Sequence, residues 1–111
     1  MVTVLSVSFS EFGRLDIRVG CVSTCERIQG RQKLFRIKVD LGSSEAQIVA
    51  GGGETYQPEY FIGKNFIVLA NLEPKMIAGT ESRGMLLAAD HKGRPIWLTV
   101  PEDIPPGTRV R

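Results

Sequence analysis

The sequence is poor in the residues that build most catalytic and metal sites. Its 111 residues include one histidine, His91, and two cysteines, Cys21 and Cys25. His91 lies in the turn-like run DHKGRP with no activated serine or cysteine nearby in the sequence, so a catalytic triad is not supported. The cysteines are four residues apart, so in a strand they would face the same side, too far apart for a disulfide. A single Cys-x3-Cys pair also lacks the four ligands of a structural zinc site, so we expect two free thiols and no cofactor.

Long apolar runs and a strong charge of either sign are missing as well. No stretch approaches the roughly 18 apolar residues that a membrane-spanning helix needs. The start, MVTVLSVSFSEF, lacks the basic segment and the long apolar run of a signal peptide, so we expect a soluble cytoplasmic protein with no membrane partner. The length favours a single domain. Because the net charge is only +2, any attraction to a nucleic acid must come from where the cations lie.

Apolar residues that alternate with polar ones predict an all-β fold. The alternation is clearest over residues 33–41, where Phe35, Ile37 and Val39 face one way. Barrel strands are expected over residues 16–26, 33–41, 45–50, 64–72 and 84–89, and a further strand over residues 95–100. Pro58 predicts a short helix between the third and fourth strands. This order matches the OB-fold, a five-stranded Greek-key barrel that binds ligands through one face and two loops. Residues 1–14 and 90–111 would be extensions of that barrel.

A long polar loop joins the last two barrel strands. It carries the cations Lys75 and Arg83, the hydroxyl of Ser82 and, at its start, the carboxamide of Asn71. A loop of this length inside a compact domain is usually functional, and these groups suit phosphates, riboses and base edges. The alternative is a solvated hairpin loop in which Asn71 and Ser82 bond only their own backbone.

Cations gather in the segment before this loop. Five of them lie between residues 27 and 38 with no acid among them: Arg27, Arg31, Lys33, Arg36 and Lys38. In an OB-fold this segment and the long loop overhang one face, which would form a basic groove for nucleic acid. The alternative is that Arg36 and Lys38 are the wet side of a half-buried strand. Since Met85 and Leu34 are the main candidate stacking platforms, the groove favours the shape and backbone of a folded RNA over unstructured single strands.

Six sequence pieces carry a resemblance to a known family. They are LDIRVG (15–20), KLFRIKVDLG (33–42), QIVAGG (47–52), YQPEYFIGK (56–64), NLEPKMIAG (71–79) and ESRGMLLAA (81–89). In order and spacing the chain resembles the structure-specific tRNA-binding domain. That domain occurs as small free-standing proteins, as the carboxy-terminal part or detached beta subunit of methionyl-tRNA synthetases, and in tRNA-synthetase cofactors.

The resemblance implies a tRNA-binding module with no catalytic activity of its own, which reads the corner of tRNA by shape. The expected direct contacts are Lys33, Arg36, Asn71, Lys75, Ser82, Arg83 and Met85, with Arg31 and Lys38 as peripheral phosphate contacts. Methionyl-tRNA synthetase is a possible partner. The alternative function is a chaperone of the CsaA type, which shares the fold and places unfolded peptide in the same groove; no acid–base pair supports an enzyme.

The chain departs from the family pattern at two places. Relatives commonly carry His-Pro-x-Ala-Asp-Lys-Leu in the first loop, whereas only Lys33 and Leu34 match here. We expect binding to be kept and its geometry to change. The exit of the third strand is Gly51-Gly52-Gly53, where relatives often have Ser-Gly followed by an aliphatic residue. The spaced fingerprint of a nucleotide-binding loop is absent, so a flexible exit is expected.

Both extensions hold more apolar residues than so small a domain should expose. They are Val2, Val4, Leu5, Val7 and Phe9 at the start, and Ile96, Trp97, Leu98, Val100, Ile104 and Val110 at the end. The resemblance implies that these segments pair two copies into a symmetric homodimer. The alternative is that both ends fold back over their own barrel and cover an open edge.

Overall fold

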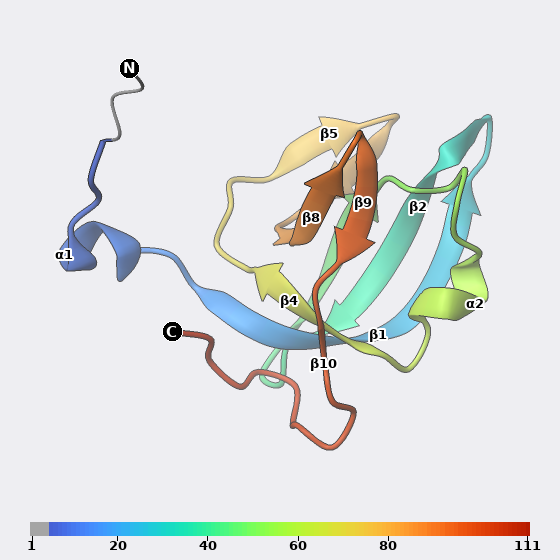
Figure 1. Cartoon of the computed structure of the whole chain (residues 1–111). Helices are drawn as coiled ribbons and strands as arrows, with labels where there is room; N and C mark the ends of the chain where they lie inside the picture. The colour runs from blue at the N-terminus through green and yellow to red at the C-terminus, as the bar shows by residue number, and fades with distance from the viewer. Residues whose placement is uncertain (1–4) are drawn as a thin grey trace.

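The computed structural model describes residues 5–111; the predicted apolar positions Val2 and Val4 lie outside this range. The fold is all-β, as expected, with two short helices (Figure 1). The elements in order are α1 (Phe9–Phe12), β1 (Ile17–Ile28), β2 (Arg31–Asp40), β3 (Glu45–Ala50), α2 (Pro58–Phe61), β4 (Asn65–Leu69), β5 (Lys75–Ile77), β6 (Thr80–Ser82), β7 (Met85–Leu86), β8 (Ala88–His91), β9 (Arg94–Trp97) and β10 (Thr99–Val100). Within the described range, neither helix is long and apolar enough to cross a membrane.

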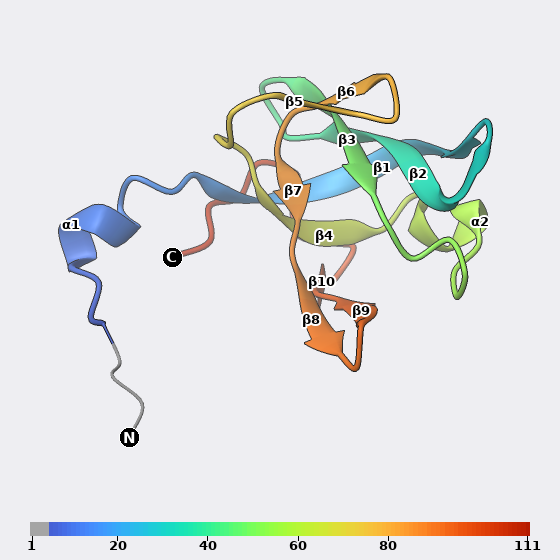
Figure 2. The ribbon, with the colours of Figure 1, turned by 90° about the horizontal axis from the view of Figure 1, so that it is seen from above.

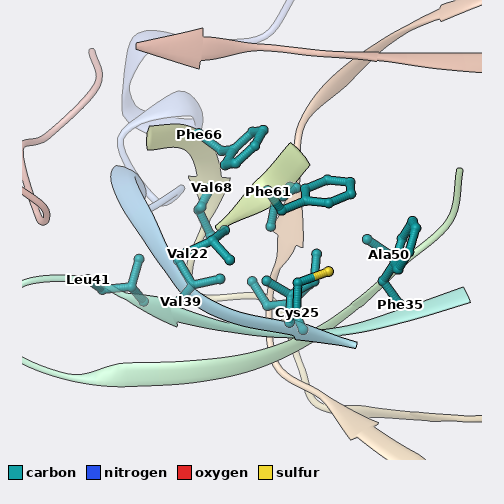
Figure 3. Packing of buried hydrophobic residues seen from close by; sticks show 12 residues of the cluster. Val22, Cys25, Phe35, Val39, Leu41, Ala50, Phe61, Phe66 and Val68 are labelled. Atoms are coloured by element: carbon teal, nitrogen blue, oxygen red, sulfur yellow. The ribbon is translucent and has the colours of Figure 1, made fainter. Parts of the chain in front are cut away.

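The OB-type barrel is built from antiparallel strands in the order β10-β4-β1-β2-β3, with β7 also paired to β4. Between β3 and the chain that enters β7, the Arg83 amide donates to the Gln47 carbonyl at 2.8 Å. Phe35, Ile37 and Val39 of β2 point inward, which confirms the alternation read from the sequence. They pack with Phe61 of α2 and Phe66 of β4 in the barrel interior (Figure 3).

Strand β1 curves across the barrel and contains a bulge. Val22 lies opposite Val39 and Thr24 opposite Lys38, so Ser23 is an extra residue. The extra residue reverses the facing of the residues that follow it, up to a second irregularity between Arg27 and Ile28. Cys25 therefore enters the core beside Val22, whereas Cys21 lies on the outer face. The prediction that the two cysteines share a side is wrong for this reason, and both thiols are free.

Two hairpins form where the sequence predicted a long loop and, after it, two strands joined by a turn at residues 91–94. The long loop folds into the β5–β6 hairpin, with Lys75 opposite Ser82. The expected fifth strand is β7, only two residues long, and the chain then forms the β8–β9 hairpin, with His91 opposite Arg94. In Figure 2 the β5–β6 and β8–β9 hairpins extend to opposite sides of β3 and β7.

The two ends of the chain behave differently. The last residues run along the outer side of β1, where the Val19 amide donates to the Thr108 carbonyl at 2.8 Å and the Val110 amide to the Ile17 carbonyl at 2.8 Å. The start of the described chain instead stands away from the barrel, as both views show (Figures 1 and 2). Its helix α1 begins at the cap Ser8, whose hydroxyl accepts from the Glu11 amide.

Candidate nucleic-acid interface

The outward face of β2 carries exposed cations, as expected from its alternation. Arg36 and Lys38 point away from the core. Residues 27–38 contain no acid, but the neighbouring strand provides one: Glu26 of β1 lies opposite Arg36 and forms an ion pair with it. Lys38 lies between Thr24 and Gln47. Among the salt bridges of residues 5–111, none involves Lys38.

Two further cations predicted as contacts are held by acids. The Lys33 ammonium lies 2.8 Å from the Glu54 carboxylate, and Arg83 Nε lies 2.7 Å from the Glu81 carboxylate. The hydrogen bond and the charge of Glu54 raise the pKa of Lys33, which keeps this side chain protonated. All these pairs are solvent-exposed, and exposed pairs contribute little to stability. A phosphate can therefore compete with the carboxylates at small cost.

Arg27, counted with the basic run, has a structural role instead. Its guanidinium donates to the carbonyls of Gln32 at 2.7 Å, Gly53 at 2.8 Å and Tyr56 at 3.1 Å. The group also lies 5.0 Å from the centre of the Phe35 ring. Arg27 thus fastens the β1–β2 loop to the segment after β3, and its donors are not directed at a ligand.

The side chain of Asn71 is hydrogen-bonded to the segment that enters β1. Its carboxamide oxygen accepts from the Asp16 amide at 2.9 Å, and its amide nitrogen donates to the Arg14 carbonyl at 2.7 Å. The sequence allowed either a ligand contact or a bond to its own turn. The structure shows a bond to a segment more than fifty residues away in the chain.

The side chain of Ser82 is hydrogen-bonded to β3, where it helps to close the barrel. The side chain is 5% exposed, and its hydroxyl accepts from the Val49 amide of β3 at 2.9 Å. Gly84 follows with φ +98°, and a Cβ there would lie 2.7 Å from the Leu69 carbonyl oxygen, so only glycine fits beside β4. The expected contact Lys75 lies opposite Ser82 at the start of β5, and Arg83 directly follows β6.

Met85 remains accessible, at 44% exposed, beside a shallow hollow between β3 and the β8–β9 hairpin. The floor of this hollow is apolar, with Val49, Pro95 and Trp97. A neighbouring hollow of about 340 Å³ is lined by Lys33 and Leu34 on one side and by Lys92 and Arg94 on the other. The structure thus brings Lys33 and Met85 to adjoining hollows.

Lys92 and Arg94 were not among the expected contacts, because residues 90–111 were assigned to dimerisation. The available signal was the run His91-Lys92-Gly93-Arg94, a glycine turn between cations. In the described part of the chain, no three His, Cys, Asp or Glu side chains gather as a metal site would require.

Comparison with known proteins adds four findings. Residues 17–109 match the family model described as "Putative tRNA binding domain". The chain is 48% identical over 105 residues to a methionine–tRNA ligase of Methanothrix thermoacetophila, which covers 95% of this chain but 16% of that protein, so the chain spans about a sixth of the relative. The crystal structure of a MetRS related protein from Pyrococcus horikoshii superposes with a TM-score of 0.93 at 38% identity, over 97% of this chain and 100% of the other. The chaperone CsaA from Bacillus anthracis superposes with a TM-score of 0.86 at 28% identity, over 96% and 100%.

Proposed function

Because the chain belongs to the tRNA-binding domain family, we propose that it binds the folded body of tRNA without catalysing a reaction. The observation that carries the proposal is the cationic outer face of β2 and its flanking loops on a barrel of this family. The proposed phosphate contacts are Arg31, Lys33, Arg36, Lys38, Lys75 and Arg83, with Met85 against a base or ribose. Asn71 and Ser82 act by positioning, since their polar atoms are bonded to backbone.

Salt dependence tests the proposal. With about three to five phosphates neutralised, the logarithm of the tRNA association constant falls with the logarithm of salt at a slope of roughly −2 to −5. Arg36→Gln lowers the magnitude of that slope by about one unit. Arg109→Gln, an exposed cation on the C-terminal segment, is the matched control. A slope near zero for the wild-type protein contradicts the electrostatic account.

The apolar floor around Met85 supports the CsaA-type alternative, capture of an unfolded peptide. A gel-shift comparison of bulk tRNA, a single-stranded oligonucleotide and an unfolded polypeptide at two salt concentrations separates the functions. Preferential, salt-sensitive retention of tRNA supports the proposal. Salt-insensitive retention of the polypeptide supports the chaperone.

We also propose that the domain works apart from a catalytic chain, as a free-standing cytoplasmic protein or a detached beta-type subunit of methionyl-tRNA synthetase. The support is that the Pyrococcus horikoshii protein is matched over its whole length. Adding this protein to a methionyl-tRNA synthetase catalytic chain should lower the KM for tRNA if the two associate. An unchanged KM argues for the free-standing form.

The remaining proposal is a homodimer that pairs through the N-terminal arm, residues 5–15. Leu5, Val7 and Phe9 are 85%, 68% and 87% exposed. Val7 and Phe9, together with Phe12 and Leu72, border an open, mostly apolar hollow of about 830 Å³ that a second copy can fill. The C-terminal segment already covers β1 of its own barrel, which favours the N-terminal arm as the interface.

Light scattering at micromolar concentration tests the dimer. We expect twice the single-chain mass of 12.2 kDa. The double variant Val7→Asp/Phe9→Asp should give the single-chain mass and keep the barrel folded. A wild-type protein that already has the single-chain mass overturns the dimer.

A further inference from the structure

The β8–β9 hairpin places two cations, Lys92 and Arg94, beside a hollow. Of the expected site residues, Lys33 also lines this hollow. Lys92 and Arg94 line one side of this hollow, and Lys33 with Glu54 lines the other. Lys33 and Glu54 neutralise each other. Within residues 5–111, Lys92 and Arg94 form no ion pair, so the hollow keeps two uncompensated positive charges.

The tip of the hairpin holds Lys92 in an unfavourable conformation. Lys92 has φ +54° and Gly93 has φ +81°, the left-handed pair of a two-residue hairpin turn. The first position of such a turn prefers asparagine, aspartate or glycine, and a lysine there is strained because its Cβ crowds the backbone. The Asp90 carboxylate fixes the turn by accepting from the Gly93 amide at 2.9 Å. A lysine at this position therefore lowers the stability of the hairpin without serving a structural role in it.

One segment holds both walls of the hollow. On the hairpin side, the Tyr56 hydroxyl donates to the Pro95 carbonyl at 2.9 Å, and a Cβ on Gly52 would lie 3.2 Å from the Pro95 ring. On the opposite side, the Gly53 amide donates to the Lys33 carbonyl at 3.0 Å. Residues 52–56 therefore set the spacing between Lys33 and the hairpin, so the hollow is organised before any ligand arrives.

We propose that Lys92 and Arg94, with Lys33 across the hollow, bind a backbone phosphate of the RNA, and that the β8–β9 hairpin is the second wall of the binding groove. This inference rests on the proposed tRNA binding. Arginine and lysine supply the donors that phosphate oxygens accept, and the single acid in the hollow is already paired. The adjoining apolar floor at Met85 and Trp97 continues the groove from this phosphate site toward β7.

The test compares two double variants that change the net charge equally. Lys92→Gln/Arg94→Gln removes the hairpin cations, and Arg109→Gln/Arg111→Gln removes two exposed cations of the C-terminal segment. Fluorescence anisotropy with labelled tRNA over a range of salt gives the Kd and its slope. We expect the hairpin variant to raise Kd about tenfold or more at low salt and to lower the slope by one to two units, and the control to stay near the wild type.

A third variant separates binding from folding. Lys92→Asn suits the left-handed turn and removes the charge, so the melting temperature should rise slightly while tRNA affinity falls. If both hairpin variants bind as the control does, the phosphate site is overturned and the proposed function stands. If the wild-type protein does not bind tRNA at any salt concentration, both are overturned. Competition by inorganic phosphate at millimolar concentration that is lost in the hairpin variant would show that the site recognises phosphate itself.

Discussion

Replacing Ser82 by alanine tests whether the turn Ser82-Arg83-Gly84-Met85 binds ligand directly or holds the barrel closed. The buried hydroxyl accepts from the Val49 amide at 2.9 Å, where β3 meets the chain that enters β7. Without it this amide has no acceptor. Leaving a buried donor unsatisfied costs about 1–3 kcal/mol. Because Val49 is half-buried, water can reach part of the site, and we expect the lower half of that range.

For a domain of this size, 1 kcal/mol shifts the melting temperature by roughly 4 °C. Ser82→Ala should therefore lower it by about 4–8 °C, measured by circular dichroism. Ser43→Ala, in the exposed β2–β3 turn, is the matched control and should change it by about 1 °C or less. Binding measured well below both melting temperatures should weaken only a few-fold, since Arg83 stays bonded through its own amide. A melting temperature equal to that of the control, with a tenfold loss of tRNA affinity, refutes this reasoning and makes Ser82 a direct contact.

Three further predictions follow from packing and charge. Gly20→Ala places a methyl group within 2.8 Å of a core valine and should destabilise the fold by about 1–3 kcal/mol in urea, whereas Gly51→Ala meets nothing within 4 Å and should not. Burial raises the pKa of Cys25 to about 12, so iodoacetamide at pH 8 should modify Cys21 first, as followed by mass spectrometry. The Cys25 thiol of the unfolded chain loses its proton near pH 9. The free energy of unfolding is therefore unaffected by this group below pH 9 and falls as the pH rises from 9 toward 12. Glu54→Gln frees its lysine partner and should tighten tRNA binding a few-fold at low salt; unchanged binding would mean that this lysine does not contact phosphate.

The parts of the fold with a strong local pattern were predictable. The strand β3 has the predicted bounds, the helix α2 begins at Pro58 as predicted, and β2 has the predicted inward face. The hairpins were predictable only in part: a turn at residues 91–94 was expected between two strands, whereas the β5–β6 pairing was not, because its turn uses Ala78-Gly79 at left-handed positions where Asn-Gly would have been recognised. A single bulge residue, invisible in the sequence, was enough to reverse the facing of Cys25.

The exposure of the basic residues was predictable from the sequence, and their charge partners were less so. Basic residues on β2 are exposed as expected, but the partners of Arg36 and Lys33 come from Glu26 and Glu54, which only strand pairing and loop packing bring near. Polar residues named as contacts can equally serve the backbone. The type of side chain alone does not distinguish the two uses, and Ser82 is the example.

The two departures from the family pattern belong to one structural feature. A Cβ on Gly53 would lie 2.8 Å from the Lys33 carbonyl carbon and would overlap the Gln32 carbonyl oxygen. The first loop can lie this close to the exit of β3 only because residue 53 has no side chain, and Arg27 bonds to both carbonyls, of Gln32 and Gly53. The glycine run is therefore a close-packing device at this point rather than a flexible exit. An aliphatic residue at position 53 would push the loop outward and carry Lys33 with it, so we expect the loop and the strand exit to vary together.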